Sequence, residues 1–171
     1  AVPPGTVIAD ESVTSGAMMR RCLLPSAPRS IFSLRGGALG WGIGGTIGVK
    51  LGQPERQVVG VIGDGAAMYA IQGLWTAAHY DIPVVYVMCS NRTYKILKRN
   101  WIIWYGHAPE AERFPESFEL VNPPLDFEKI AGSLGIHGRT VEKPEDLAPA
   151  FKEAINLGHP AVVNVMIDGA L

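Results

Sequence analysis

The stretch VVGVIGDG, residues 58–65, decides the fold class. Its first five residues are apolar or glycine and show no polar alternation, which predicts a strand that is buried on both faces. Gly63 and Gly65 permit a tight turn, and a helical pattern of apolar residues follows at once. A doubly buried strand that leads directly into a helix is typical of a parallel sheet covered by helices.

Similar units lie on both sides of this stretch. We expect strands at residues 6–9, 30–34, 58–62, 83–88 and 161–167, and helices at residues 13–24, 39–51, 66–80, 127–134 and 145–157. This alternation predicts an α/β fold, in which a doubly wound, mainly parallel sheet carries helices on both faces. Residues 101–124 interrupt the alternation and predict a long loop of the kind that is more often functional than idle.

The composition fits one domain. The 171 residues are 47% apolar, and 15 basic residues nearly balance 16 acidic ones, so neither nucleic acid nor an anionic membrane is expected as a partner. No apolar run approaches the length that spans a bilayer.

Cys22 and Cys89 lie far apart, which favours a reduced, cytoplasmic setting with both thiols as small core residues. The first residues lack an initiator Met, so we expect residues 1–171 to be the C-terminal part of a longer enzyme, although a processed start would look the same.

Polar side chains stand at the ends of two expected strands. Asp64 follows the strand at 58–62, and Asn91 follows the next strand, 27 residues later. The carboxyl ends of parallel strands meet at one edge of the sheet, so both side chains are expected at the same place. A helix start there suits a phosphate, and a divalent cation such as Mg²⁺ would separate the phosphate from Asp64.

Each part of this pattern is weak alone, since Gly-Asp-Gly is a common turn and Asn91 by itself would be a strand-end cap. The combination is far more specific. A dinucleotide-binding GxGxxG fingerprint does not follow any expected strand, because Gly40, Gly42 and Gly45 fall within an expected helix.

Gly-Asp-Gly followed by about thirty residues and an asparagine resembles the cofactor motif of the thiamine-diphosphate-dependent enzymes. Residues 3–98 resemble the C-terminal, diphosphate-binding domain of the benzoylformate decarboxylase type, most clearly in PERQVVGVIGDGAAMYAIQGLWTAAHYDIPVVYVMCSNRTY. Residues 125–168 resemble the same domain more loosely. The resemblance implies thiamine diphosphate and Mg²⁺ as cofactors and a 2-keto acid as substrate.

The resemblance also implies roles for particular residues. Asp64 and Asn91 would bind Mg²⁺ through their side chains, and Thr93 through its carbonyl. The remaining diphosphate contacts would come from Val13, Thr14, Gly63, Gly65, Ala66, Tyr94 and Lys95.

Two further groups complete the implied site. In the loop at 35–40, the Gly37 carbonyl would accept a hydrogen bond from the aminopyrimidine, and Leu39 would be the apolar wedge that bends the cofactor. Without the resemblance, Leu39 would be interpreted as an ordinary core leucine. Ile96, Leu97 and Asn100 match positions that line the substrate pocket. Lys95, Lys98 and Arg99 share one face of a helix, which favours a solvated surface.

Part of the active site is expected elsewhere. The family's activating glutamate belongs to a pyrimidine-binding domain, and no segment here matches that domain, so no catalytic residue is expected within this chain and the chain alone is expected to be inactive. The glycine-rich stretch at 40–48 indicates either an interface of a homo-oligomer or close packing on the domain's own sheet. An acetolactate synthase-like carboligase and a non-catalytic cofactor-binding module are the alternative functions.

Overall fold

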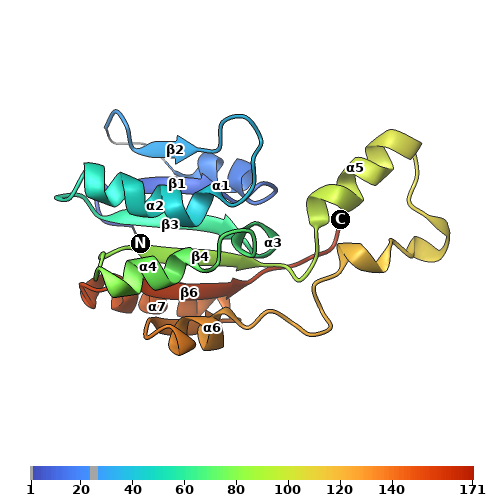
Figure 1. Cartoon of the computed structure of the whole chain (residues 1–171). Coiled ribbons are helices and arrows are strands. Elements are labelled where there is room, and N and C mark those ends of the chain that lie inside the picture. The colour runs from blue at the N-terminus through green and yellow to red at the C-terminus, as the bar shows by residue number, and fades with distance from the viewer. Residues whose placement is uncertain (1, 24–26) are drawn as a thin grey trace.

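The computed structural model describes residues 2–23 and 27–171. A six-stranded sheet of order β2-β1-β3-β4-β6-β5 forms its centre, and every neighbouring pair of strands is parallel. The strands are β1 (Val7–Glu11), β2 (Ile31–Ser33), β3 (Val58–Gly63), β4 (Val85–Ser90), β5 (His137–Val141) and β6 (Ala161–Met166). The strand arrows point the same way in Figure 1, so their carboxyl ends share one edge. The predicted doubly wound α/β fold is confirmed.

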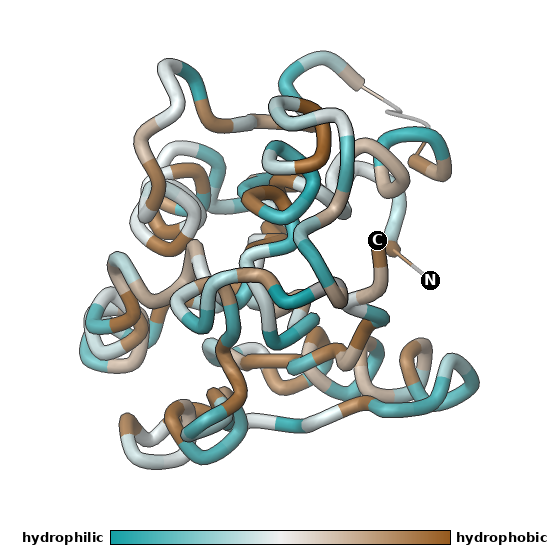
Figure 2. The backbone as a smooth tube through the Cα atoms, turned by 90° about the vertical axis from the view of Figure 1, so that its right-hand side faces the viewer, coloured by the Kyte–Doolittle hydropathy of each residue, from teal (hydrophilic) through white to brown (hydrophobic). Residues whose placement is uncertain are grey.

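Helices cover both faces of the sheet. One face carries α2 (Trp41–Gly52), α3 (Asp64–Ala67), α4 (Gly73–His79) and α6 (Phe127–Ser133), and the other carries α1 (Gly16–Cys22) and α7 (Pro144–Asn156). Alternate residues of β3 serve the two layers: Val58 and Ile62 pack toward α2, whereas Val59 and Val61 pack toward α7. In the view onto the carboxyl edge, apolar stretches of backbone run through the middle of the molecule (Figure 2).

The helix predicted over residues 66–80 is wrong in its continuity. The chain forms α3, then a series of i to i+3 turns, and only then α4. Tyr69, within these turns, packs so closely on Gly40 that a Cβ atom there would lie 2.9 Å from the Tyr69 Cβ. The turns bring Tyr69 against the start of α2. The predicted helix at 13–24 begins later, at Gly16, and its predicted end at Leu24 lies outside the described residues.

Two further elements differ from the sequence prediction. Helix α5 spans Lys95–Tyr105, so the first part of the predicted loop is helical, and short 3-10 turns at Glu110–Glu112 and Glu116–Phe118 follow it. Figure 1 shows α5 projecting beyond the carboxyl edge of the sheet. Strand β5 was missed because its sequence, HGRTV, is polar and belongs to a half-exposed edge strand. No helix in the described ranges is long and apolar enough to cross a membrane.

Candidate functional site

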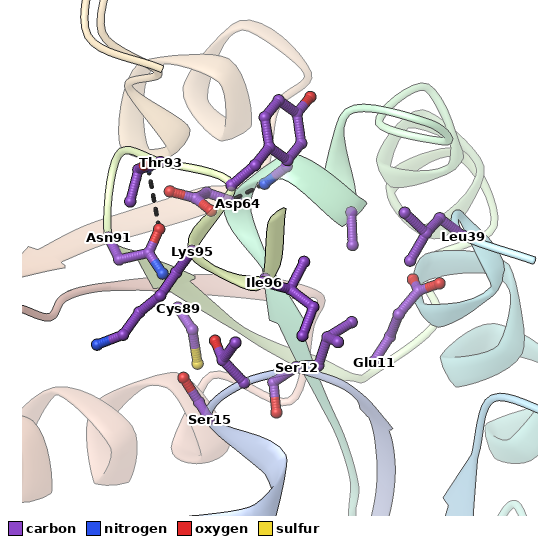
Figure 3. Close-up of a pocket in the computed structure, with 16 residues that line it drawn as sticks. Glu11, Ser12, Ser15, Leu39, Asp64, Cys89, Asn91, Thr93, Lys95 and Ile96 are labelled. Atoms are coloured by element: carbon purple, nitrogen blue, oxygen red, sulfur yellow. Dashed lines mark hydrogen bonds between the residues drawn. The ribbon is translucent and has the colours of Figure 1, made fainter. Parts of the chain in front are cut away.

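A pocket lies at the carboxyl edge of the sheet, where the ends of β1, β3 and β4 meet the start of α5 (Figure 3). It brings together twelve of the residues predicted from sequence: Val13, Thr14, Leu39, Gly63, Asp64, Gly65, Ala66, Asn91, Thr93, Tyr94, Lys95 and Ile96. These residues come from four separate segments of the chain. The same-edge rule for parallel strands accounts for their meeting.

Three predicted site residues do not line this pocket. Gly37 lies in the loop before α2 with a left-handed φ of 75°, two residues from the pocket-lining Leu39. Leu97 and Asn100 are exposed on α5. Their predicted contacts with the cofactor or substrate remain predictions.

Asp64 is the most distinctive group of the pocket. Its residue is only 5% exposed, its Oδ1 accepts a hydrogen bond from Gly65 N at 2.9 Å, and its Oδ2 accepts one from Arg92 N at 2.7 Å. Burial raises the pKa of this carboxyl above its usual value, although the backbone N–H groups act in the opposite direction. Among the described residues no Lys, Arg or His forms a salt bridge with it. A cation at the free lone pairs of Asp64 would offset the cost of this buried charge.

The turn after β4 supplies further oxygen atoms. Asn91 Oδ1 accepts a hydrogen bond from Thr93 N at 3.0 Å, and Arg92 between them has a left-handed φ of 59°. No group of three His, Cys, Asp or Glu side chains suited to a metal exists in the described part of the chain. One carboxylate with amide and carbonyl oxygens nevertheless fits Mg²⁺, which takes few protein ligands and completes its shell with phosphates and water.

The segment after α5 supports this turn. Thr93 Oγ1 and Tyr94 N both donate to the Phe118 carbonyl at 2.8 Å, and Leu120 N donates to the Arg92 carbonyl at 2.8 Å. Residues 116–120 of the predicted loop therefore form a brace behind the turn. The Tyr94 N–H is committed to this brace, so its predicted contact with a phosphate is not available here, although its ring still lines the pocket.

Lys98, on α5, contacts this brace through Glu119. Its side chain is 13% exposed, forms a salt bridge with Glu119 at 2.5 Å and lies over the Phe114 ring. The interpretation of Lys95, Lys98 and Arg99 as one solvated face is therefore wrong for Lys98. The placement of Cys22 in the core is also wrong, since it is exposed on α1.

Tyr94 packs against the start of α3. A Cβ atom at Gly65 would collide with the Tyr94 ring, so a glycine is required for this approach. The Gly65 N–H already donates to Asp64. Ala66, which is buried with 7% of its surface exposed, is the next pocket-lining residue along the start of this helix.

Four pocket residues were missed by the sequence analysis: Glu11, Ser12, Ser15 and Cys89. Strand β1 was expected to end at Ala9, but it continues through the buried Asp10 and Glu11. The strand-end rule that identified Asp64 and Asn91 would have found Glu11 had this strand been extended. Cys89 stands at the end of β4, where burial raises the pKa of its thiol to about 12.

Comparison with known proteins agrees with this geometry. Residues 13–165 match the family described as thiamine pyrophosphate enzyme, C-terminal TPP binding domain. The chain belongs to the thiamine pyrophosphate enzymes. The match begins just after β1 and includes α2, the Gly-Asp-Gly turn and the turn after β4, which contribute most of the pocket.

Individual members of the thiamine pyrophosphate enzymes show the same relationship. Benzoylformate decarboxylase of Pseudomonas aeruginosa is 33% identical over 163 residues, which cover 95% of this chain and 29% of that protein. The acetolactate synthase large subunit of Haemophilus influenzae is 34% identical over 135 residues, which cover 77% of this chain and 22% of that protein. The structure of a thiamine diphosphate-dependent 4-hydroxybenzoylformate decarboxylase of Rhodococcus jostii RHA1 superposes with a TM-score of 0.87, at 32% identity, over 97% of this chain and 30% of that one. The chain thus spans less than a third of the length of these relatives.

Proposed function

We propose that this chain binds thiamine diphosphate and Mg²⁺ for a 2-keto acid decarboxylase of the benzoylformate decarboxylase type. One observation carries the proposal: the buried Asp64 carboxylate and the Asn91 side chain lie at the ends of adjacent strands, in one pocket. Among the described residues, only backbone N–H groups donate hydrogen bonds to Asp64, and a divalent cation would supply a positive charge beside it.

Different residues of the chain would bind the metal, the diphosphate and the cofactor rings. Asp64, Asn91 and the Thr93 carbonyl would hold Mg²⁺, and the Ala66 amide with the Val13–Thr14 turn would face the diphosphate. Leu39 lines the same pocket and would support the cofactor rings. When bound, thiamine diphosphate supplies the electron sink for cleavage beside a keto group.

Substrate choice would depend on α5. Ile96 lines the pocket, and Leu97 and Asn100 lie further along the same helix. We favour decarboxylation because the match to benzoylformate decarboxylase covers 95% of this chain. A carboligase of the acetolactate synthase type is the second candidate, supported by the 34% identity to such a subunit over 77% of the chain.

The remaining catalytic groups would come from outside the chain. A pyrimidine-binding domain would supply the activating glutamate, in keeping with the small share of each relative that this chain covers. Glu11 is no substitute, because its carboxylate already accepts three hydrogen bonds from the start of α2. A homo-oligomer is the assembly that would bring such a domain to the pocket, and the isolated chain would turn over no substrate.

Product analysis tests the proposed reaction. The protein in its full natural length would be incubated with benzoylformate or pyruvate, thiamine diphosphate and Mg²⁺. The proposal expects aldehyde and CO₂ in equal amounts. A carboligated hydroxyketone as the main product would favour the synthase, and cofactor binding without any turnover of 2-keto acids would indicate a non-catalytic module.

A further inference from the structure

Glu11 is a buried carboxylate without a role in the proposed chemistry. It is the last residue of β1, is 2% exposed and lines the pocket. Its Oε1 accepts hydrogen bonds from Gly40 N at 2.8 Å and Trp41 N at 3.1 Å, and its Oε2 accepts one from Gly42 N at 2.7 Å. These three N–H groups belong to the start of α2, 29 to 31 residues later in the chain.

In the described ranges, Glu11 is the acceptor found for each of these three N–H groups. The first N–H groups of a helix lack partners within the helix, and its positive dipole end favours a nearby anion. The N-cap residue of α2 is Gly40, which has a left-handed φ of 96° and no side chain to cap the helix. Glu11 therefore acts as a cap that is supplied by a neighbouring strand.

The residue directly before this capped turn is Leu39. Figure 3 shows Leu39 and the Glu11 carboxylate side by side at one end of the pocket. Gly36 and Gly37, just before Leu39, both have left-handed φ angles and exposed backbones. In the described part of the chain, a single hydrogen bond, from Gly40 N to Glu11 Oε1, joins residues 35–40 to another element. The position of Leu39 thus depends on the hold that Glu11 has on Gly40.

We propose that Glu11 is a positioning residue whose carboxylate holds the first turn of α2 and thereby fixes Leu39 against the cofactor rings. The cofactor part of this inference rests on the proposed function, whereas the hold on α2 does not. The negative charge matters, since a glutamine would offer one oxygen to three N–H groups and would turn its own NH₂ toward the rest.

Two variants disturb this hold from opposite sides. Glu11→Gln keeps the shape of the side chain and removes the charge. Gly42→Ala leaves Glu11 in place but puts a Cβ atom 2.7 Å from its Oε2 and 3.0 Å from Ile62 Cγ1, which displaces the carboxylate. Gly44→Ala is the matched control, because its Cβ would meet nothing within 4 Å in the same helix.

Amide hydrogen exchange in the protein of full natural length measures the hold directly. We expect exchange at Gly40, Trp41 and Gly42 to rise about tenfold or more in Glu11→Gln and Gly42→Ala, with β3 and the Gly44→Ala control unchanged. Unchanged exchange at these three amides would overturn the proposal. An equal rise in β3 would overturn it too, because it would show a general loss of stability.

Kinetics then tests the link to Leu39. At saturating thiamine diphosphate and Mg²⁺, kcat is expected to fall about tenfold or more in both variants, while the cofactor dissociation constant stays within about threefold of wild type. A loss of cofactor affinity without a fall in kcat would refute the positioning role. If wild-type protein binds no thiamine diphosphate, the proposed function fails, and hydrogen exchange still decides whether Glu11 holds α2.

Discussion

The Oδ2 atom of Asp64 lies 2.7 Å from the amide nitrogen of Arg92, so the carboxylate that ends β3 also fixes the turn that ends β4. This contact holds Arg92 at a φ of 59°, in the left-handed region that side chains with a Cβ disfavour. A hydrogen bond therefore joins the two halves of the candidate metal site, and the turn at Arg92 stores local backbone strain.

Replacement of Arg92 tests this strain. Because glycine adopts the left-handed region at little cost, whereas alanine pays about 1 kcal/mol or more there, we expect Arg92→Gly to be more stable than Arg92→Ala by about 1 kcal/mol. Urea unfolding of both variants gives the comparison. The usual order, in which alanine is the more stable, would contradict the strained turn.

The contact between Gly65 and Tyr94 makes a second prediction. A Cβ atom at position 65 collides with the Tyr94 ring, so Gly65→Ala should lower the free energy of unfolding by about 1–3 kcal/mol. Adding Tyr94→Ala should cost less in that background than in wild type, because the collision is gone. Gly132→Ala, which meets open space in α6, is the control and should not destabilise the fold. Strictly additive losses in the double variant would show that the ring lies elsewhere.

Replacing the Thr93 hydroxyl by a methyl group removes one hydrogen bond of the brace behind the Asn91 turn. Thr93→Val keeps the shape of a residue that is 5% exposed and removes the hydrogen bond from Oγ1 to the Phe118 carbonyl. We expect a loss of about 1 kcal/mol in urea unfolding. Thr76→Val in α4, whose hydroxyl makes no hydrogen bond to a described residue, should change stability by less. An equal effect at both positions would mean that the hydrogen bond from the Thr93 hydroxyl contributes nothing to stability.

The two cysteines should differ in reactivity. Burial raises the pKa of the Cys89 thiol from 9.0 to about 12, so this thiol stays protonated and unreactive at pH 8, whereas Cys22 is exposed. Iodoacetamide followed by peptide mass spectrometry should find Cys22 alkylated and Cys89 intact. A raised pKa in the folded state also means that Cys89 favours folding below pH 9 and that this contribution is lost as the pH rises toward about 12. Rapid alkylation of Cys89 in folded protein at pH 8 would contradict its burial.

The central strands of the fold and one side of the pocket could be predicted from the sequence. Val58–Ile62 and the strand before Cys89 are apolar on both faces, and the same-edge rule then placed Asp64 beside Asn91 without any tertiary information. Local periodicity and strand-end chemistry were sufficient for these elements.

The remaining parts of the fold and of the site depend on long-range contacts, which leave no local pattern in the sequence. Strand β5 is polar because it lies at the sheet edge, and Glu11 ends a strand with a carboxylate whose hydrogen-bond donors come from the start of α2. The brace joins Thr93 to Phe118, 25 residues away, through backbone groups that every residue possesses. No residue type marks such pairings in advance.

Calorimetric titration of thiamine diphosphate, with Mg²⁺ or with a chelator, tests the central claim most directly. The account predicts binding that requires Mg²⁺ and that is lost in Asp64→Ala but retained in Asp146→Ala, where an exposed carboxylate on α7 is removed. Binding that is equally strong in chelator, or that survives in Asp64→Ala, would contradict the assignment of this pocket as the magnesium and diphosphate site.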